Sequence, residues 1–443
     1  GSNRPHSLAA FAAAAQMITL PALLGDFWGA ILAYVFFYPV LMSVVWMVGG
    51  ISFFFRFERQ PHRIVNQPPE RDDYPLIAVL VPCFNEEAHV EETIEAQMEL
   101  QHPNFEVIAI NDGSKDRTGE LLNALAEQFP KLRVIHQVQN QGKAVGLNTA
   151  ALMTRAEILV GIDGDARLDP HSLHWMVRHF DDPEVAAVTG NPRVRNRSTL
   201  LGRIQVGEFS SIVGLIKRAQ RSVGLIFTVS GVITAFRRSA LHEVGYWSPE
   251  KLTEDVDISW KLQLAGWEVR FDPRALCWIL MPESFSGLWK QRLRWSMGGT
   301  QVLLDYWPQL LSFKTLRLWP LFIEYAMSML WACLFAVLAV YRLIDLIFYR
   351  IDLHSAPVLL MGWAGLLIGT TCLLQMMLSL VLDKPYDKGL LKNYFWMIWY
   401  PIIYWVITAA TAVVALPKAF KRETGKRARW ISPDRGIRPD ASR

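Results

Sequence analysis

The chain has 443 residues, of which 51% are hydrophobic and only 19% are charged. That length exceeds one small domain, and the apolar residues gather toward both ends, which excludes a single soluble core and indicates membrane segments around a soluble middle. A formal net charge of +4 is too small to indicate a nucleic-acid partner. The four cysteines are far apart and show no ligand spacing, so we expect neither a zinc site nor a disulfide framework.

We expect N-terminal transmembrane helices within residues 8–55. Leu8–Leu24 is apolar but contains a proline, whereas Phe27–Phe55 carries no charge and exceeds the roughly 20 residues that span a bilayer. Arg56 and Arg63 follow closely, and clustered positive charge beside a span favours the cytoplasmic side. The domain that follows is therefore predicted to be cytosolic.

Residues 70–283 alternate short β-branched runs with helical stretches. This alternation predicts a mostly parallel α/β sheet, with strands in LIAVLVP, FEVIAIND, LRVIHQ and EILVGID. Ligands of such sheets bind beyond the carboxyl ends of the strands. Asn85, Asp112 and Asp163 all fall at such ends, so we expect them to share one edge of the sheet.

The chain after Pro282 returns to the membrane. Residues 284–317 mix tryptophan with lysine and arginine and predict interfacial helices, and residues 318–417 contain three further hydrophobic segments. Three crossings would place the basic tail, residues 418–443, outside, whereas its positive charge favours the inside. Either one segment is re-entrant or the tail breaks the charge rule, and we favour a cytosolic tail.

Acidic residues follow two of the predicted strands. Asp163 and Asp165 flank a glycine that allows close backbone approach, and paired carboxylates supply hard oxygen ligands for Mg²⁺ or Mn²⁺. Asp112 ends another strand. Asp-Gly is also ordinary turn chemistry, so each cluster alone has a structural alternative.

A third acid, Asp255, opens a predicted helix in TEDVDISW. A carboxylate there can cap the helix, or it can act as a general base toward a hydroxyl. We select Asp255 over Glu254 and Asp257, which complement the helix dipole. Lys143 follows Gln141-Gly142 at another helix start, where it either meets phosphate or is a solvated first-turn lysine.

The motif QRLRW, Gln291 to Trp295, is a candidate diphosphate site. Arg292 and Arg294 can grip a diphosphate and offset leaving-group charge, while Trp295 can stack on a sugar. The structural alternative is arginine and tryptophan side chains at a membrane surface.

Taken in order, PCFNEE, NDGS, DGD, TED and QRLRW resemble the processive family 2 glycosyltransferases, the group that includes cellulose, chitin and hyaluronan synthases. The resemblance covers nearly the whole chain. Stretches such as IQVGEFSSIVGLIKRAQR, FTVSGVITAFRRSAL and ARWISPDRG are similar to the members that join N-acetylglucosamine through β-1,6 links. The implied fold is an α/β GT-A domain inserted between transmembrane helices of an integral membrane protein.

The resemblance also implies roles for individual residues. Asp112 would contact the uridine of UDP-N-acetylglucosamine with Phe84, Asn85 and Glu86 beside it. Asp163 would serve the diphosphate, and Asp165 would bind the divalent cation. Asp255 would deprotonate the acceptor. The diphosphate and the acceptor end would be held by Gln291, Arg292, Arg294 and Trp295.

Further expectations follow from the resemblance alone. They are a bacterial inner-membrane location with a cytosolic catalytic domain, inversion at the anomeric carbon, and export of the growing polysaccharide for a biofilm matrix. A small two-helix membrane subunit, cyclic di-GMP as activator and membrane lipid are the expected partners. A chitin- or hyaluronan-type synthase is the alternative enzyme, and a transporter that senses a nucleotide is the alternative from another class.

Overall fold

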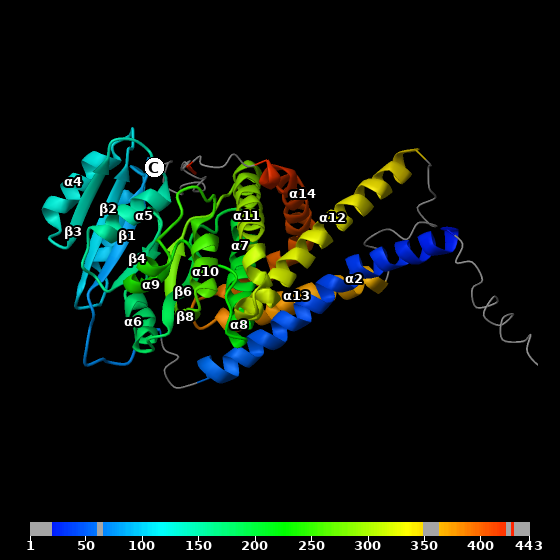
Figure 1. The fold of residues 1–443 in the computed structure, drawn as a ribbon, viewed down its shortest axis with the longest axis horizontal. Coiled ribbons are helices and arrows are strands. Elements are labelled where there is room, and N and C mark those ends of the chain that lie inside the picture. Colours follow the sequence, from blue (N-terminus) through cyan, green and yellow to red (C-terminus); the bar gives the residue numbers. More distant parts are fainter. Residues whose placement is uncertain (1–19, 60–64, 349–362, 422–426, 429–443) are drawn as a thin grey trace, which may run out of the picture.

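An α/β domain occupies one end of the molecule, and long apolar helices extend from it toward the other (Figure 1). The computed structural model describes residues 20–59, 65–348, 363–421 and 427–428. The strands alternate with helices as the sequence pattern predicts, which confirms the α/β fold class.

Eight strands form one mixed sheet in the order β3-β2-β1-β4-β7-β6-β8-β5. The first four in that order pair in parallel, whereas β7 pairs antiparallel with both of its neighbours. β6 and β8 are parallel, and β5 is antiparallel to β8. The strands are β1 (Ile77–Cys83), β2 (Phe105–Asp112), β3 (Leu132–Gln137), β4 (Ile158–Gly161), β5 (Arg167–Leu168), β6 (Val185–Val194), β7 (Thr234–Arg237) and β8 (Glu268–Ile279).

Three helices connect the successive parallel strands β1 to β4: α3 (Val90–Met98), α4 (Thr118–Gln128) and α5 (Lys143–Leu152). A fourth helix, α6 (Ser172–Val177), follows β5 and continues as the 3₁₀ turn η3 (Arg178–Asp181) before β6, which runs antiparallel to β5. The first of these helices does not follow β1 directly but begins at Val90. The chain before it makes a turn in which Asn85 has a φ of 53°, a left-handed conformation that asparagine tolerates. That turn carries part of the site described below.

A helical rod lies between the sheet and the membrane helices. It consists of α7 (Leu200–Phe209), the π-helical turn η4 (Ser210–Leu215) and α8 (Ile216–Ser222). Two further helices of the domain are α9 (Arg238–Glu243) and α10 (Glu254–Leu264), and α11 (Phe285–Tyr306) follows the last strand. Ser284 caps α11 by accepting a hydrogen bond from the Gly287 amide. α11 carries the QRLRW motif, and its interfacial position stays a prediction.

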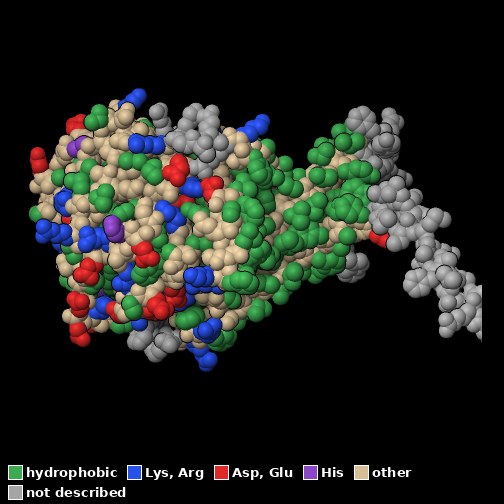
Figure 2. All heavy atoms as spheres, viewed as in Figure 1, with side chains coloured by type: hydrophobic (Ala, Val, Ile, Leu, Met, Phe, Trp, Pro, Cys, Tyr) green, Lys and Arg blue, Asp and Glu red, His purple; other side chains and the backbone are tan. Residues whose placement is uncertain are grey.

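The apolar part consists of helices whose hydrophobic side chains face outward, as the green surface of Figure 2 shows. α2 (Leu20–Phe53) continues as η1 (Phe54–Glu58), the short turns η5 (Trp307–Leu311) and η6 (Phe313–Leu318) lead into α12 (Trp319–Phe348), and α13 (Trp363–Asp383) follows. Among the described residues, four helical segments are long and apolar enough to cross a membrane: Gly25–Glu58, Phe313–Tyr341, Gly365–Asp383 and Ile403–Phe420. Most of the predicted first span, Leu8–Leu24, lies outside the described residues.

The last hydrophobic segment is not one continuous α-helix. It is divided into the 3₁₀ helix η7 (Leu390–Trp399), the π turn η8 (Pro401–Trp405) and α14 (Val406–Phe420), which packs along α11 and α12 (Figure 1). Beyond it, the Arg427 guanidinium donates to the Gln141 side chain at 2.6 Å, and the Ala428 amide donates to the Pro249 carbonyl at 2.9 Å. The start of the basic tail thus lies against the α/β domain.

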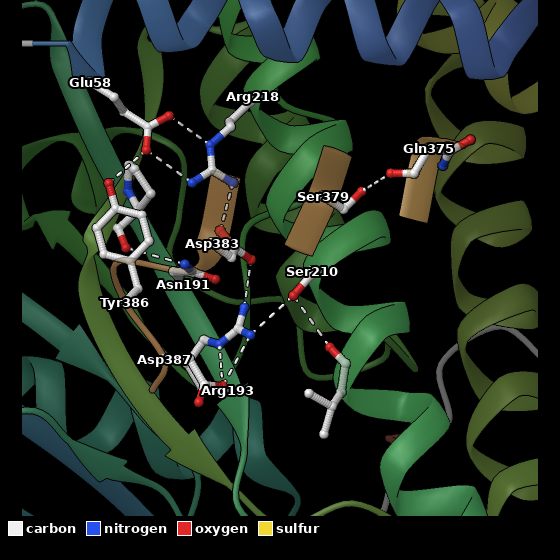
Figure 3. Close-up of polar contacts among 12 residues, drawn as sticks. Glu58, Asn191, Arg193, Ser210, Arg218, Gln375, Ser379, Asp383, Tyr386 and Asp387 are labelled. Carbon is white, nitrogen blue, oxygen red and sulfur yellow. Dashed lines mark hydrogen bonds and ion pairs between the residues drawn. The ribbon is translucent and has the colours of Figure 1, made fainter. Parts of the chain in front are cut away.

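A buried chain of alternating carboxylates and guanidinium groups joins the domain to the ends of the membrane helices (Figure 3). Arg218 of α8 pairs with Glu58 at 2.8 Å and with Asp383 at 2.9 Å. Arg193 of β6 pairs with the same Asp383 at 2.6 Å and with Asp387 at 3.2 Å. We call this set the junction cluster; its members are Glu58, Arg193, Arg197, Arg218, Asp383, Tyr386 and Asp387. Because a buried charge without its partner is costly, the junction cluster fixes these elements relative to one another.

Candidate active site

The turns after β1 and β2 interlock at the carboxyl edge of the sheet. The Asn85 amide donates to the Ser114 hydroxyl at 3.0 Å, and the Glu86 amide donates to the Thr118 hydroxyl at 2.8 Å. Phe84 is half-buried, Asn85 is exposed and Glu86 is buried. Phe84, Asn85 and Glu86 therefore line one side of the site at the carboxyl edge of the sheet.

Asp112 holds the loop that precedes α5. Its two carboxylate oxygens accept hydrogen bonds from the backbone amides of Gln141 at 2.8 Å and Gly142 at 2.9 Å. Burial raises the pKa of Asp112, although these two hydrogen bonds oppose the shift. Gly142 has a φ of 95°, a conformation that strongly favours glycine. Asp112 therefore positions the residue that comes next, Lys143.

Lys143 connects three parts of the chain through its ammonium group. The group lies 2.6 Å from an Asp163 oxygen, 3.1 Å from a Glu254 oxygen and 3.0 Å from the Gly231 carbonyl. Burial alone would lower the pKa of Lys143, but the surrounding carboxylates of Asp163, Glu254 and Asp255 raise it above its ordinary value. Lys143 is thus a fixed positive charge among acids from the segment after β4 and from the first turn of α10.

Asp255 lies in the first turn of α10, beside that lysine. Burial, followed by the charge of Glu254, raises the pKa of Asp255 to about 6, while the charges of Lys143 and Arg294 oppose the rise. The carboxylate lines a small cavity together with Lys143, Ser230, Gly231, Thr234, Trp247 and Glu254. A carboxylate whose pKa lies near neutrality and which borders a cavity is suited to general-base chemistry.

The neighbouring acid on α10, Asp257, has a structural function instead. It accepts hydrogen bonds from the Ser248 hydroxyl at 2.6 Å and from the Tyr306 hydroxyl at 2.8 Å. The two hydroxyls tie α10 to the preceding loop and to α11. This difference in environment supports the selection of Asp255 over Asp257.

Asp163 and Asp165 both lie close enough to the buried thiol of Cys277 for their charges to raise its pKa. Burial raises the pKa of Cys277 well above its ordinary value, and the negative charges of Asp165 and Asp163 add to the rise. Asp165 is 2% exposed. Within the described part of the chain, no three side chains of His, Cys, Asp or Glu gather as a metal site. Two carboxylates alone are too few to complete a cation's coordination.

The two arginines of QRLRW have different surroundings. Arg292 is buried, pairs with Glu208 at 2.6 Å, and lies over the Trp295 ring at 4.4 Å. Arg294 instead lies close enough to Asp255 for its charge to lower that pKa. The Arg294 guanidinium itself lies 3.5 Å from the Leu252 carbonyl. The substrate roles of the four selected residues of this motif stay predictions.

Several residues at the site were not selected from the sequence. Glu254 was assigned only to the helix dipole, yet it pairs with Lys143. Ser230 and Gly231 line the cavity, and Lys217 bonds to Ser230 from the rod. The stretch FTVSGVITAFRRSAL, which contains both residues, indicates the family but gives neither of them a role. No pattern in the sequence marks Lys217, because one lysine in a helical stretch is ordinarily solvent-exposed.

A mixed sheet with acids at its strand ends and a carboxylate opening a later helix is typical of the GT-A class of sugar-nucleotide transferases. A mannosyltransferase from Pyrobaculum calidifontis, solved in complex with GDP-Man and Mn²⁺, shows the same fold. The TM-score is 0.62 at 19% identity, over 89% of this chain and 99% of that one. The match confirms the predicted GT-A fold.

The family model described as glycosyltransferase like family 2 matches residues 75–298. A poly-β-1,6-N-acetyl-D-glucosamine synthase of Staphylococcus epidermidis strain RP62A is 38% identical over 409 residues, which are 91% of this chain and 98% of the relative. The synthase of the same name from Staphylococcus aureus strain COL is 38% identical over 406 residues, with the same coverage. The chain belongs to glycosyltransferase family 2.

The chain is accordingly a hexosyltransferase, as its sequence predicts. The relatives are named as synthases of a polysaccharide, which supports a polymerising role here. The apolar helices that flank the domain agree with a membrane protein.

Proposed function

We propose that the chain is a processive, inverting glycosyltransferase that polymerises N-acetylglucosamine from UDP-N-acetylglucosamine through β-1,6 links. It moves the polymer across the bacterial inner membrane for a biofilm matrix. The observation that carries this proposal is the Asp255 carboxylate, which has a raised pKa and borders a cavity beside the Lys143 bridge. The names of the relatives support the sugar and the linkage.

In the proposed reaction, Asp255 accepts the proton of the acceptor's 6-hydroxyl. The oxygen attacks the anomeric carbon of the donor from the face opposite UDP, forming the new bond as the bond to the diphosphate breaks. UDP leaves with that electron pair, so an α-linked donor gives a β link in one displacement. Lys143 and Arg294 provide positive charge that offsets the charge developing on the diphosphate.

A divalent cation, Mg²⁺ or Mn²⁺, fits the donor set of this edge. Mg²⁺ is commonly held by one or two carboxylates together with substrate phosphates, and Asp163 and Asp165 supply hard oxygens two positions apart in the sequence. We assign Asp165 to the cation and Asp163 to the diphosphate side, where its ion pair with Lys143 lies. When bound, the cation would neutralise charge on the leaving diphosphate.

The nucleoside is assigned to the turns at the ends of β1 and β2. Phe84, Asn85 and Glu86 form one wall, and Asp112 lies at the base of the loop before α5. Gln291, Arg292, Arg294 and Trp295 are assigned to the diphosphate and the acceptor end. For Arg292, this assignment requires a change in its pairing with Glu208, because that pair occupies its guanidinium here.

The partners rest on the family resemblance. They are a small two-helix membrane subunit and cyclic di-GMP as activator. The outward-facing apolar side chains of α2, α12 and α13 supply the surface for membrane lipid. The contact of Arg427 with Gln141 supports a tail on the cytosolic side, and hence a last segment that packs on α11 without crossing.

The test is polymer synthesis by the protein and its small partner in vesicles supplied with UDP-N-acetylglucosamine and Mg²⁺. The expected product is a high-molecular-weight polymer that a β-1,6-specific hydrolase degrades. A polymer cleaved only by chitinase or hyaluronidase would replace the linkage proposal with the alternative synthases. Release of free monosaccharide with UDP would contradict polymerisation.

A further inference from the structure

Two neighbouring residues of α8 contact two different centres of the molecule. Arg218 belongs to the junction cluster, where Glu58 and Asp383 neutralise it (Figure 3). Lys217, one residue earlier, lies 2.6 Å from the Ser230 hydroxyl and 3.4 Å from the Thr189 hydroxyl. The helix that is fixed to the membrane segments therefore also contacts the turn that lines the cavity.

The turn that contains Ser230 and Gly231 packs directly on the proposed base. A Cβ added at Gly231 would lie 3.3 Å from an Asp255 carboxylate oxygen and 3.2 Å from the Lys143 ammonium. The Ser230 amide donates to the Thr189 hydroxyl at 2.8 Å, and the Thr234 hydroxyl donates back to the Ser230 carbonyl at 2.8 Å. Any displacement of this turn would therefore change the space beside Asp255.

Lysine is an expensive residue at position 217. The side chain is 5% exposed, and burying an ammonium group costs more than burying an apolar side chain of the same shape. Burial lowers the pKa of Lys217 to about 7, although the nearby charge of Asp255 raises it in part. A hydrophobic residue would fill the same volume at lower cost, so the ammonium group has a purpose other than packing.

We propose that Lys217 is a positioning residue of the transfer reaction. Through the Ser230 hydroxyl it holds the 230–231 turn against Asp255, so that an acceptor hydroxyl in the cavity meets the carboxylate in line with the donor. The inference rests on the proposed function and assigns Lys217 no direct contact with donor, cation or acceptor. Arg218 keeps α8 from moving away from the turn.

The experiment compares full-length wild type with Lys217→Met, Lys217→Arg and Ser230→Ala in vesicles with the small partner. Because a small misplacement of reacting groups can cost up to about 100-fold in rate, we expect Lys217→Met to lower kcat by ~10- to 100-fold. KM for UDP-N-acetylglucosamine and the Kd for UDP should stay within about threefold of wild type, because the donor contacts remain. Lys217→Arg keeps a donor and should recover part of the rate.

The double variant Lys217→Met, Ser230→Ala tests whether the lysine acts through the serine. Its kcat should be no lower than that of the worse single variant, because both changes remove the same contact. Arg237→Met is the matched control. Arg237 ends β7 and bonds to the carbonyls of Val185, Phe180 and Asp182, away from the cavity, so its loss should lower Tm and leave kcat unchanged.

Three outcomes would overturn the proposal: an unchanged kcat in Lys217→Met, a loss of UDP binding together with kcat, or independent effects in the double variant. If Lys217→Met does not fold, an unchanged kcat in Ser230→Ala has the same meaning. Failure of the wild type to make polymer would instead contradict the proposed function, and the two failures are thereby distinguished.

Discussion

The active-site edge and the junction cluster both consist of paired acidic and basic side chains, but the pairs have different functions in the two regions. In the junction cluster, each guanidinium of Arg193 and Arg218 lies between two of three carboxylates, and all five groups are buried. At the active-site edge, Glu254 and Asp255 are adjacent acids that share the positive charge of Lys143, and both border a cavity.

The difference shows how environment decides the use of a charge. Alternating, saturated charges favour one arrangement of the chain, because separating any pair leaves a buried ion uncompensated. Crowded acids with one shared cation leave a carboxylate with a raised pKa, which is poised to take a proton. Substitutions in the two regions should therefore affect different quantities, rate in one and stability in the other.

The largest expected effect is at Asp255. Because general-base catalysis contributes about 10²- to 10⁴-fold, Asp255→Asn should lower polymer synthesis by roughly 10³-fold. UDP binding should persist, because the amide has nearly the same shape and Lys143 keeps its contact with Asp163. Synthesis and UDP binding are measured on the same vesicles. Retained synthesis with retained binding would mean that Asp255 is not the base.

Next in size is the loss of a guanidinium from the junction cluster. Arg218→Met leaves Glu58 and Asp383 without their shared partner and should lower the free energy of unfolding by about 3–5 kcal/mol. Thermal unfolding in detergent gives the comparison. The control is Arg197→Met, since that side chain is 26% exposed and its partner Asp387 keeps Arg193. If both variants lost the same free energy of unfolding, full burial between two carboxylates would not explain the importance of Arg218.

The pH dependence of the rate tests the raised pKa of Asp255 at the active-site edge. Asp255 functions as a base only when it is deprotonated, and its pKa is about 6. The rate should therefore fall as pH drops below about 6, approaching tenfold per pH unit. In Lys143→Met the positive charge that lowers this pKa is absent, so the acid limb should move to higher pH. An acid limb that stays in place would show that another group controls it.

The smallest effect on rate is expected where the C-terminal tail contacts the loop before α5. A Cβ at Gly142 would overlap the Ala428 carbonyl oxygen, and its φ of 95° is strained for alanine. Gly224 has a φ of 78° and open space around it, so Gly224→Ala reports strain alone. We expect about 1–3 kcal/mol of backbone strain in each variant, which should lower its Tm. Gly142→Ala should in addition raise KM for the donor by a few-fold, whereas Gly224→Ala should leave KM unchanged. Identical kinetics in the two variants would mean that the tail contact has no effect on the donor.

Much of the fold follows from local patterns. The strands FEVIAIND and LRVIHQ coincide with β2 and β3, because alternating β-branched residues and short connections leave few other arrangements. For the last hydrophobic segment, hydropathy alone leaves the surroundings open. Ile403–Phe420 is long and apolar enough to cross a membrane, and α14 within it also packs on α11 and α12. Hydropathy measures the cost of water contact and does not distinguish lipid from protein.

For the site, the sequence determined which side chains are available: Asp112, Asp163, Asp165 and Asp255 stand at strand ends and at a helix start, positions that local spacing reveals. Tertiary structure alone decided their partners. It paired Glu254 with Lys143 and Arg292 with Glu208, brought the charge of Arg294 close enough to lower the pKa of Asp255, and buried Lys217 against Ser230. These contacts join residues far apart in the chain, and their strength depends on burial, which no local pattern encodes.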